Sequence, residues 1–166
     1  MSVEHYRAFI NHAYWGLDKI VLALGESPER LDEPVSAGAQ TPRTTLRHMF
    51  AFERGFLSRL QGGDGSFSEP GPEDLDELLA AWAPIRQGWV DYFDSVTDAQ
   101  LDEPFELRLW DERYRTTRAN VLSQFVQHQG QHRSELAVMA STFGHSPGEF
   151  DWWDYLEKTG QPLEQI

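Results

Sequence analysis

Apolar residues recur at steps of three and four along the start of the chain, which predicts an amphipathic helix over residues 3–24. The members of this stripe are Val3, Tyr6, Ile10, Ala13, Leu17, Ile20 or Val21, and Leu24. The pattern stops near Gly25. Residues 26–41 hold two prolines and many turn-forming residues, so they are expected to form a loop.

A second helix is expected from Thr41-Pro42 to about Gln61. A threonine side chain can cap free N–H groups at a helix start, and proline suits the first helical position. The apolar positions of this helix are Leu46, Met49, Phe50, Phe52, Phe56, Leu57 and Leu60. The segment 62–72, rich in Gly and Pro, is the clearest break in the chain.

A third helix is expected from about Glu73 to Phe93, with acidic residues in its first turn, where they complement the helix dipole. Pro84 lies inside this helix and is expected to kink or split it, because proline removes a backbone hydrogen bond. Residues 103–116 alternate around Asp-Glu-Arg, which predicts either a small hairpin or an irregular loop.

The fourth long helix is expected from about Thr117 to Phe143, and a short final helix over residues 151–158. Four long helices with a long crossover between the third and the fourth predict an all-α fold, a four-helix bundle with a short C-terminal helix. The chain has 166 residues and no internal repeat, so a single domain over residues 1–166 is expected.

The chain is strongly acidic, with 14 Lys and Arg against 27 Asp and Glu and a net charge of −13. Such a surface repels phosphate backbones and anionic lipid, so neither nucleic acid nor a membrane is an expected partner. The lack of cysteine excludes disulfides, thiolate metal sites and a thiol nucleophile within the chain. The N-terminus resembles no signal peptide and no apolar run could span a membrane, so a cytoplasmic location is expected.

Two histidines, His128 and His132, fall within the apolar stripe of the fourth helix. Side chains four residues apart are neighbours on a helix face, so both rings can reach one metal ion. A glutamine stands where zinc metallopeptidases keep their general-base Glu, which excludes that class. No Glu stands three residues before a histidine, so the Glu-x-x-His pairs of carboxylate di-iron bundles are absent too. A mononuclear site remains, unless both rings are ordinary core residues.

A third ligand must come from elsewhere in the fold, and periodicity does not choose it. The candidates are His5, His12, His48, His145 and, on the fourth helix itself, Glu135. Without a metal, His5, His12 and His48 are expected to be partly exposed rings on their helices, and His145, which follows Gly144, to be a loop residue.

The order of these features resembles the DinB/YfiT-like family, whose members are four-helix bundles regarded as metalloenzymes. The match covers nearly the whole chain. Its most specific part is one histidine in the second helix combined with His-x-x-x-His-Arg in the fourth. The matching pieces are Tyr14-Trp15, TPRTTLRHMFAFERGFLSRL (41–60), HQGQHRSEL (128–136) and GHSPGEFDWWDYL (144–156).

The resemblance implies a metal triad of His48, His128 and His132, with Ni²⁺ or Zn²⁺ as the usual divalent metal ion. Many relatives read Gly-Gln where this chain has Ser134 and Glu135. Glu135 is therefore open to three interpretations: it orients a ligand, it is an extra ligand, or it pairs with Arg133 or another cation.

Three neutral imidazoles leave an ion an open position, where it can polarise a carbonyl or bind a thiolate. Relatives include transferases that use low-molecular-weight thiols such as bacillithiol or mycothiol. The leading hypothesis is therefore a metal-dependent enzyme acting on a small-molecule substrate, either a thiol-dependent S-transferase or a hydrolase. The alternative is a non-catalytic metal- or ligand-binding module of a stress response.

Relatives also form homodimers, so a homodimer is expected here. Several tryptophans are expected to offer aromatic surface for it: Trp82, Trp89, Trp110, Trp152 and Trp153.

Overall fold

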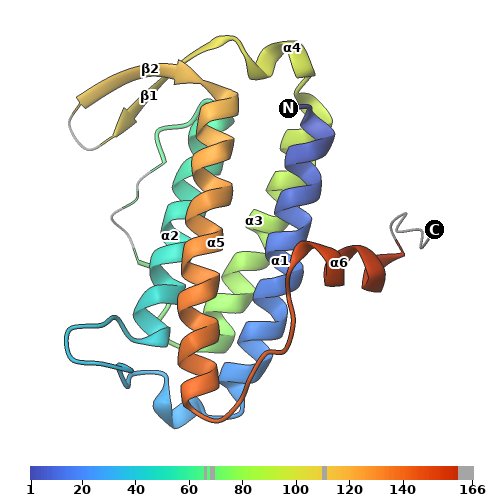
Figure 1. Cartoon of the computed structure of the whole chain (residues 1–166). Coiled ribbons are helices and arrows are strands. Elements are labelled where there is room, and N and C mark those ends of the chain that lie inside the picture. Colours follow the sequence, from blue (N-terminus) through green and yellow to red (C-terminus); the bar gives the residue numbers. More distant parts are fainter. Residues whose placement is uncertain (66, 68–69, 110–111, 161–166) are drawn as a thin grey trace.

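The computed structural model describes residues 1–65, 67, 70–109 and 112–160. Four long helices lie side by side along one axis (Figure 1): α1 (Val3–Gly25), α2 (Pro42–Leu60), α3 (Leu75–Ser95) and α5 (Arg118–Thr142). The shorter elements are η1 (Pro28–Arg30), α4 (Asp98–Leu101), β1 (Pro104–Leu109), β2 (Glu112–Thr117) and α6 (Trp152–Thr159). The prediction of a mostly helical four-helix bundle with a short C-terminal helix is confirmed.

Each long helix begins after a residue whose side-chain oxygen accepts a hydrogen bond from the backbone N–H three residues later. These N-cap residues are Ser2, Thr41, Asp74 and Thr117. The start expected at Thr41-Pro42 is confirmed, whereas the third helix begins at Leu75 rather than at Glu73. The helix boundaries therefore follow local capping chemistry.

The helix α3 runs without interruption through Pro84, so the expected split does not occur. Proline at this position removes one intrahelical hydrogen bond, the one to the carbonyl of Ala80. Both residues are exposed, so water can satisfy that carbonyl. The helix keeps its inward-facing apolar stripe on both sides of the proline.

The core lies where α1 packs on α5 and where α2 packs on both α3 and α5. Trp82 and Trp89 are each only 1% exposed and belong to this core, so the expectation that they offer surface for a partner is wrong. The apolar stripe of α3 turns them inward, and their indole N–H groups find an acceptor there. Trp152 is half-buried and Trp153 is 63% exposed, while Trp110 lies outside the described residues.

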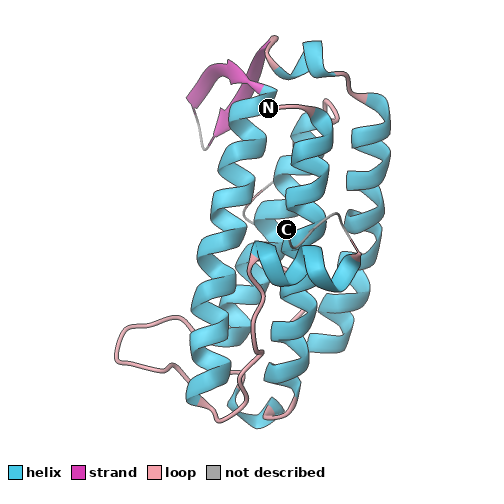
Figure 2. Ribbon diagram, turned by 45° about the vertical axis from the view of Figure 1, so that its right-hand side comes forward, coloured by secondary structure: helices cyan, strands magenta, loops and turns pink. Residues whose placement is uncertain are grey.

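The segment between α3 and α5 holds the short helix α4, which periodicity did not predict, and an antiparallel hairpin of β1 and β2. Phe105 pairs with Thr116 and Leu107 with Tyr114, so the hairpin interpretation of residues 103–116 holds, with residues 110–111 outside the described part. The hairpin lies at one end of the bundle, and α6 lies against α1 (Figure 2). Within the described ranges, no helix is both long and apolar enough to cross a membrane.

Candidate metal centre

Three imidazole rings meet between α2 and α5. They belong to His48 on α2 and to His128 and His132 on α5, and one ring nitrogen from each lies within 4.8 Å of the other two. The Nε2 atoms of His48 and His128 are 2.9 Å apart. The ring of His132 has its centroid 4.9 Å from that of His48 and 4.5 Å from that of His128. These three residues are called the histidine cluster below.

The local sequence explains how the rings are held. His128 and His132 are four residues apart on α5 and therefore share one face of the helix. Phe52 lies four residues after His48 on α2 and stacks on the His128 ring, with centroids 4.1 Å apart and planes inclined by 13°. Phe67 stacks on Phe52 in turn, at 4.9 Å. An aromatic wall thus supports one side of the histidine cluster.

The other candidate histidines lie elsewhere. His5 is exposed and caps the start of α1, where its Nδ1 is 2.7 Å from Ser2 Oγ. His12 donates its Nε2–H to the carbonyl of Phe150, at 2.9 Å. His145 is in the loop after α5. The structure therefore brings His48, and none of these three, to the pair on α5.

Not every ring nitrogen of the histidine cluster has a good hydrogen-bond partner. Only one proton can lie between the two Nε2 atoms of His48 and His128, and the buried Nδ1 of His128 has no hydrogen-bond partner among the described residues. Burial, with the neighbouring rings of His132 and His48, lowers the pKa of His128 to about 3. Burial and His132 also lower the pKa of His48. These two rings are neutral at pH 7, which is the form that binds a metal ion, so the donor set fits a single divalent ion.

Glu135 lies beside the cluster and contacts His132. Its Oε2 is 2.7 Å from His132 Nδ1, and its Oε1 accepts a hydrogen bond from Gln131 Nε2 at 3.0 Å. Burial alone would raise the pKa of Glu135, but the hydrogen bonds from Gln131 and His132 outweigh it and lower the pKa. The carboxylate is therefore ionised at neutral pH.

The structure does not support a pair between Glu135 and Arg133. The guanidinium of Arg133 is directed between α5 and α1, where it donates to the carbonyls of Gln129 and His12, at 3.4 and 3.3 Å. Arg133 is only 7% exposed, and burial lowers its pKa to about 10. Of the interpretations that the sequence left open, the geometry favours Glu135 as a residue that orients a ring.

A cavity of about 570 Å³ adjoins the cluster and offers room for a small molecule. Its wall includes His132 and Glu135, together with Val35, Gln40 and Met139. The loop between α1 and α2 therefore forms one side of the space beside the histidines.

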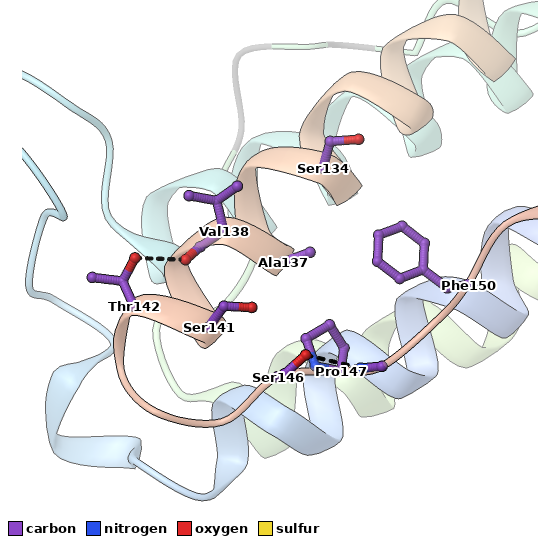
Figure 3. A pocket seen from close by; sticks show the side chains of 9 residues that line it. Ser134, Ala137, Val138, Ser141, Thr142, Ser146, Pro147 and Phe150 are labelled. Carbon is purple, nitrogen blue, oxygen red and sulfur yellow. Dashed lines mark hydrogen bonds between the residues drawn. The ribbon is translucent and has the colours of Figure 1, made fainter.

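A second hollow of about 490 Å³ lies between the end of α5 and residues 146–150, where Phe150 lies across from Ala137 (Figure 3). No titratable side chain is found among the described residues that line it. The hydroxyl of Thr142 already donates to the carbonyl of Val138. This hollow therefore offers less chemistry than the space beside the histidine cluster.

One buried polar residue, Glu53, was not found from the sequence. It is 0% exposed and accepts hydrogen bonds from Trp82 Nε1 at 2.6 Å, from Trp89 Nε1 at 2.7 Å, from Gln129 Nε2 at 3.3 Å and from the hydroxyl of Tyr14. Burial raises its pKa to about 7, although the bonds from Trp82 and Trp89 oppose the rise. These five residues are called the Glu53 cluster below.

A signal for Glu53 is present in the sequence. It lies three residues after Phe50 and three before Phe56, within the apolar stripe of the second helix. A carboxylate at such a position must have partners, because an unpaired buried charge is very costly. The pattern does not say which residues those partners are.

Comparison with known proteins agrees with this architecture. The structure is similar to the crystal structure of TT2238, a four-helix bundle protein, with a TM-score of 0.57 and 17% sequence identity over 79% of this chain and 97% of that one. At that identity the likeness supports the fold alone. No curated protein matches the chain. The DinB superfamily matches residues 17–136, which is more than half of the sequence and includes all three clustered histidines. The chain belongs to the DinB superfamily.

Proposed function

We propose that this protein is a metal-dependent enzyme that holds one divalent ion, Ni²⁺ or Zn²⁺, on His48, His128 and His132. The observation that carries the proposal is the convergence of three ring nitrogens within 4.8 Å of one another. The lowered pKa values of His48 and His128 support it, because neutral imidazoles have a lone pair to offer. The two facing Nε2 atoms of His48 and His128, 2.9 Å apart, support it too, since only one proton can lie between them and one ion can bind both.

Three protein ligands are typical of catalytic rather than structural sites. A divalent ion bound here supplies Lewis acidity, which lowers the pKa of a thiol and polarises a carbonyl. The reaction that we infer is the transfer of a small electrophilic group to a low-molecular-weight thiol. The thiol releases its proton to water, its sulfur forms a bond to the electrophilic carbon, and the leaving group departs with the electron pair of the broken bond. The chain contains no cysteine, so the thiol arrives as a cosubstrate.

The residues of this chain would bind and shield the reactants. The cavity of about 570 Å³ beside His132 accommodates a small molecule, and Val35 and Met139 give it apolar walls. Phe52 and Phe67 cover another side of the cluster and limit the access of water. A hydrolase would use the same ion and the same cavity, so it is the second reaction to test.

The test begins with the metal content of the untagged protein and of the variants His48→Ala, His128→Ala and His5→Ala. The first two variants remove cluster rings, whereas His5 is exposed and outside the cluster. We expect about one equivalent of Ni or Zn per chain in the wild type and in His5→Ala, and its loss in both cluster variants. If the wild type holds no metal and takes up none on addition, the histidines are core residues and the proposal fails.

The second step is a turnover screen with thiols, electrophiles and esters. We expect turnover that requires the metal and disappears in His128→Ala. Saturable metal binding without turnover across the panel would instead identify a non-catalytic binding module.

A further inference from the structure

We propose that Glu135 is a positioning residue of the metal centre: its carboxylate accepts the Nδ1–H of His132 and so aims Nε2 of that ring at the ion. The inference rests on the proposed function, because it concerns the same three histidines. It goes further by assigning a role to a residue that is not itself one of the three ligands.

The first argument is geometric. Glu135 Oε2 lies 2.7 Å from His132 Nδ1, a short distance for a charge-assisted hydrogen bond. The other oxygen, Oε1, is held by Gln131 Nε2 at 3.0 Å. All three residues are within one turn of α5, so the helix itself sets their spacing. A carboxylate held at both oxygens cannot turn away from the ring.

The second argument comes from the tautomer. A neutral imidazole carries one proton, and a carboxylate at Nδ1 keeps that proton there. The lone pair is then on Nε2, the nitrogen that remains free to coordinate. His132 is buried, with 10% of its side chain exposed, while Glu135 is 42% exposed and lies on the solvent side of the ring. The ring is therefore fixed before a metal ion arrives.

The three rings differ in this respect. In the part of the chain that the structure describes, the buried Nδ1 of His128 has no partner, and the ring is held by stacking on Phe52. His48 contacts His128 through Nε2. His132 alone within this cluster has a carboxylate on the nitrogen opposite the expected ligand atom. Such partners of metal-binding histidines fix the ring and raise its basicity.

The third argument is electrostatic. Three neutral imidazoles leave a divalent ion with its full charge, and Glu135 places a negative charge next to one of them. Arg133 does not cancel this charge, because its guanidinium points to the carbonyls of Gln129 and His12. The carboxylate therefore stabilises the bound ion as well as orienting His132.

The test is the metal dissociation constant, measured by competition with a chelator for the wild type, Glu135→Ala, Glu135→Gln and Gln124→Ala. Gln124 is an exposed residue on the same helix and serves as the matched control. We expect Glu135→Ala to weaken binding by roughly 10- to 100-fold. Glu135→Gln should weaken it less, because the amide oxygen still accepts from Nδ1, and Gln124→Ala should bind like the wild type.

A second readout uses the metal-free protein. Long-range ¹H–¹⁵N spectra should show His132 as the Nδ1–H tautomer in the wild type and as a mixture of tautomers in Glu135→Ala, with unchanged thermal stability. A wild type that binds no metal would overturn the proposed function. A wild type that binds metal while Glu135→Ala binds it equally well would overturn the role of Glu135 alone.

Discussion

Two polar clusters interrupt the apolar core of this bundle, and they differ in whether their groups are satisfied. In the Glu53 cluster, one carboxylate accepts four hydrogen bonds from three other helices. In the histidine cluster, two nitrogens face each other at 2.9 Å, and a third, on His128, is buried with no hydrogen-bond partner among the described residues. A buried polar group normally has a partner, so of these two clusters the histidine cluster is the one whose arrangement calls for an explanation.

The two clusters are also connected. Gln129 directly follows His128 on α5 and donates to Glu53. This bond joins α5 to α2 directly beside the histidine cluster. The Glu53 cluster thus links the helices of the bundle, and the histidine cluster still has ring nitrogens that a ligand could bind.

The comparison between the two clusters can be tested by substitution. The largest change in the free energy of unfolding is expected for Glu53→Ala. It leaves the N–H groups of Trp82, Trp89 and Gln129 buried without their acceptor, so the free energy of unfolding should fall by about 3–5 kcal/mol. Urea unfolding of metal-free protein measures it. A loss below about 1 kcal/mol would mean that the Glu53 cluster does not hold the bundle together.

The pH dependence of stability is expected to be the next largest effect. The pKa of Glu53 is about 7 in the folded protein and 4.5 in its ordinary state, so the folded protein binds a proton more tightly than the unfolded chain. This tighter proton binding by Glu53 stabilises the folded protein. The stabilisation is fully present below pH 4.5 and is lost as the pH rises towards 7, so the free energy of unfolding falls by at most about 3 kcal/mol. The lowered pKa values of His48 and His128 act in the opposite direction over this range, but they do so in both proteins. The difference between the wild-type and Glu53→Gln stabilities, measured by denaturant unfolding from pH 4.5 to 8, should therefore show this loss, whereas parallel profiles would contradict it.

Metal binding should stabilise the folded protein only when the histidine cluster is intact. At an ion concentration of 100 times the dissociation constant, the free energy of unfolding should rise by about 2.7 kcal/mol in the wild type. His128→Ala should gain far less, because it lacks one of the three rings. Thermal melts with Ni²⁺ or Zn²⁺ and with a chelator measure the difference, and an equal gain in both proteins would place the ion elsewhere.

The smallest effect is expected from His128→Leu in metal-free protein. The change removes a buried Nδ1 that has no partner among the described residues, but it also removes the Nε2 that faces His48 and the ring that stacks on Phe52. The free energy of unfolding should therefore change by no more than about 1 kcal/mol. Urea unfolding in the presence of a chelator tests it. If the variant is instead destabilised as strongly as Glu53→Ala, the two clusters do not differ as described.

Much of the fold could be predicted from the sequence because it depends on neighbours in the chain. The apolar stripes, the cap at Thr41 and the hairpin over residues 103–116 are all local patterns. The pairing of His128 with His132 is local too, since one helical turn separates them. None of these features depends on how one helix packs against another.

The sequence did not allow a prediction of which side chains meet between different helices. His5, His12 and His48 lie similarly at the edges of their stripes, and only the placement of α2 against α5 brings His48 to the pair. The burial of Trp82 and Trp89 also depends on packing between helices, because both indoles donate to Glu53 on α2.

The sequence by itself determined the helices, their order, their inward faces and the family resemblance, because these follow from spacing along one chain. Only the tertiary structure decided which histidine completes the cluster, what surrounds Glu53 and which group Glu135 contacts. The physical reason is that the period of a helix defines a face but not its rotation or axial shift against a neighbour. Those two quantities set which side chains meet.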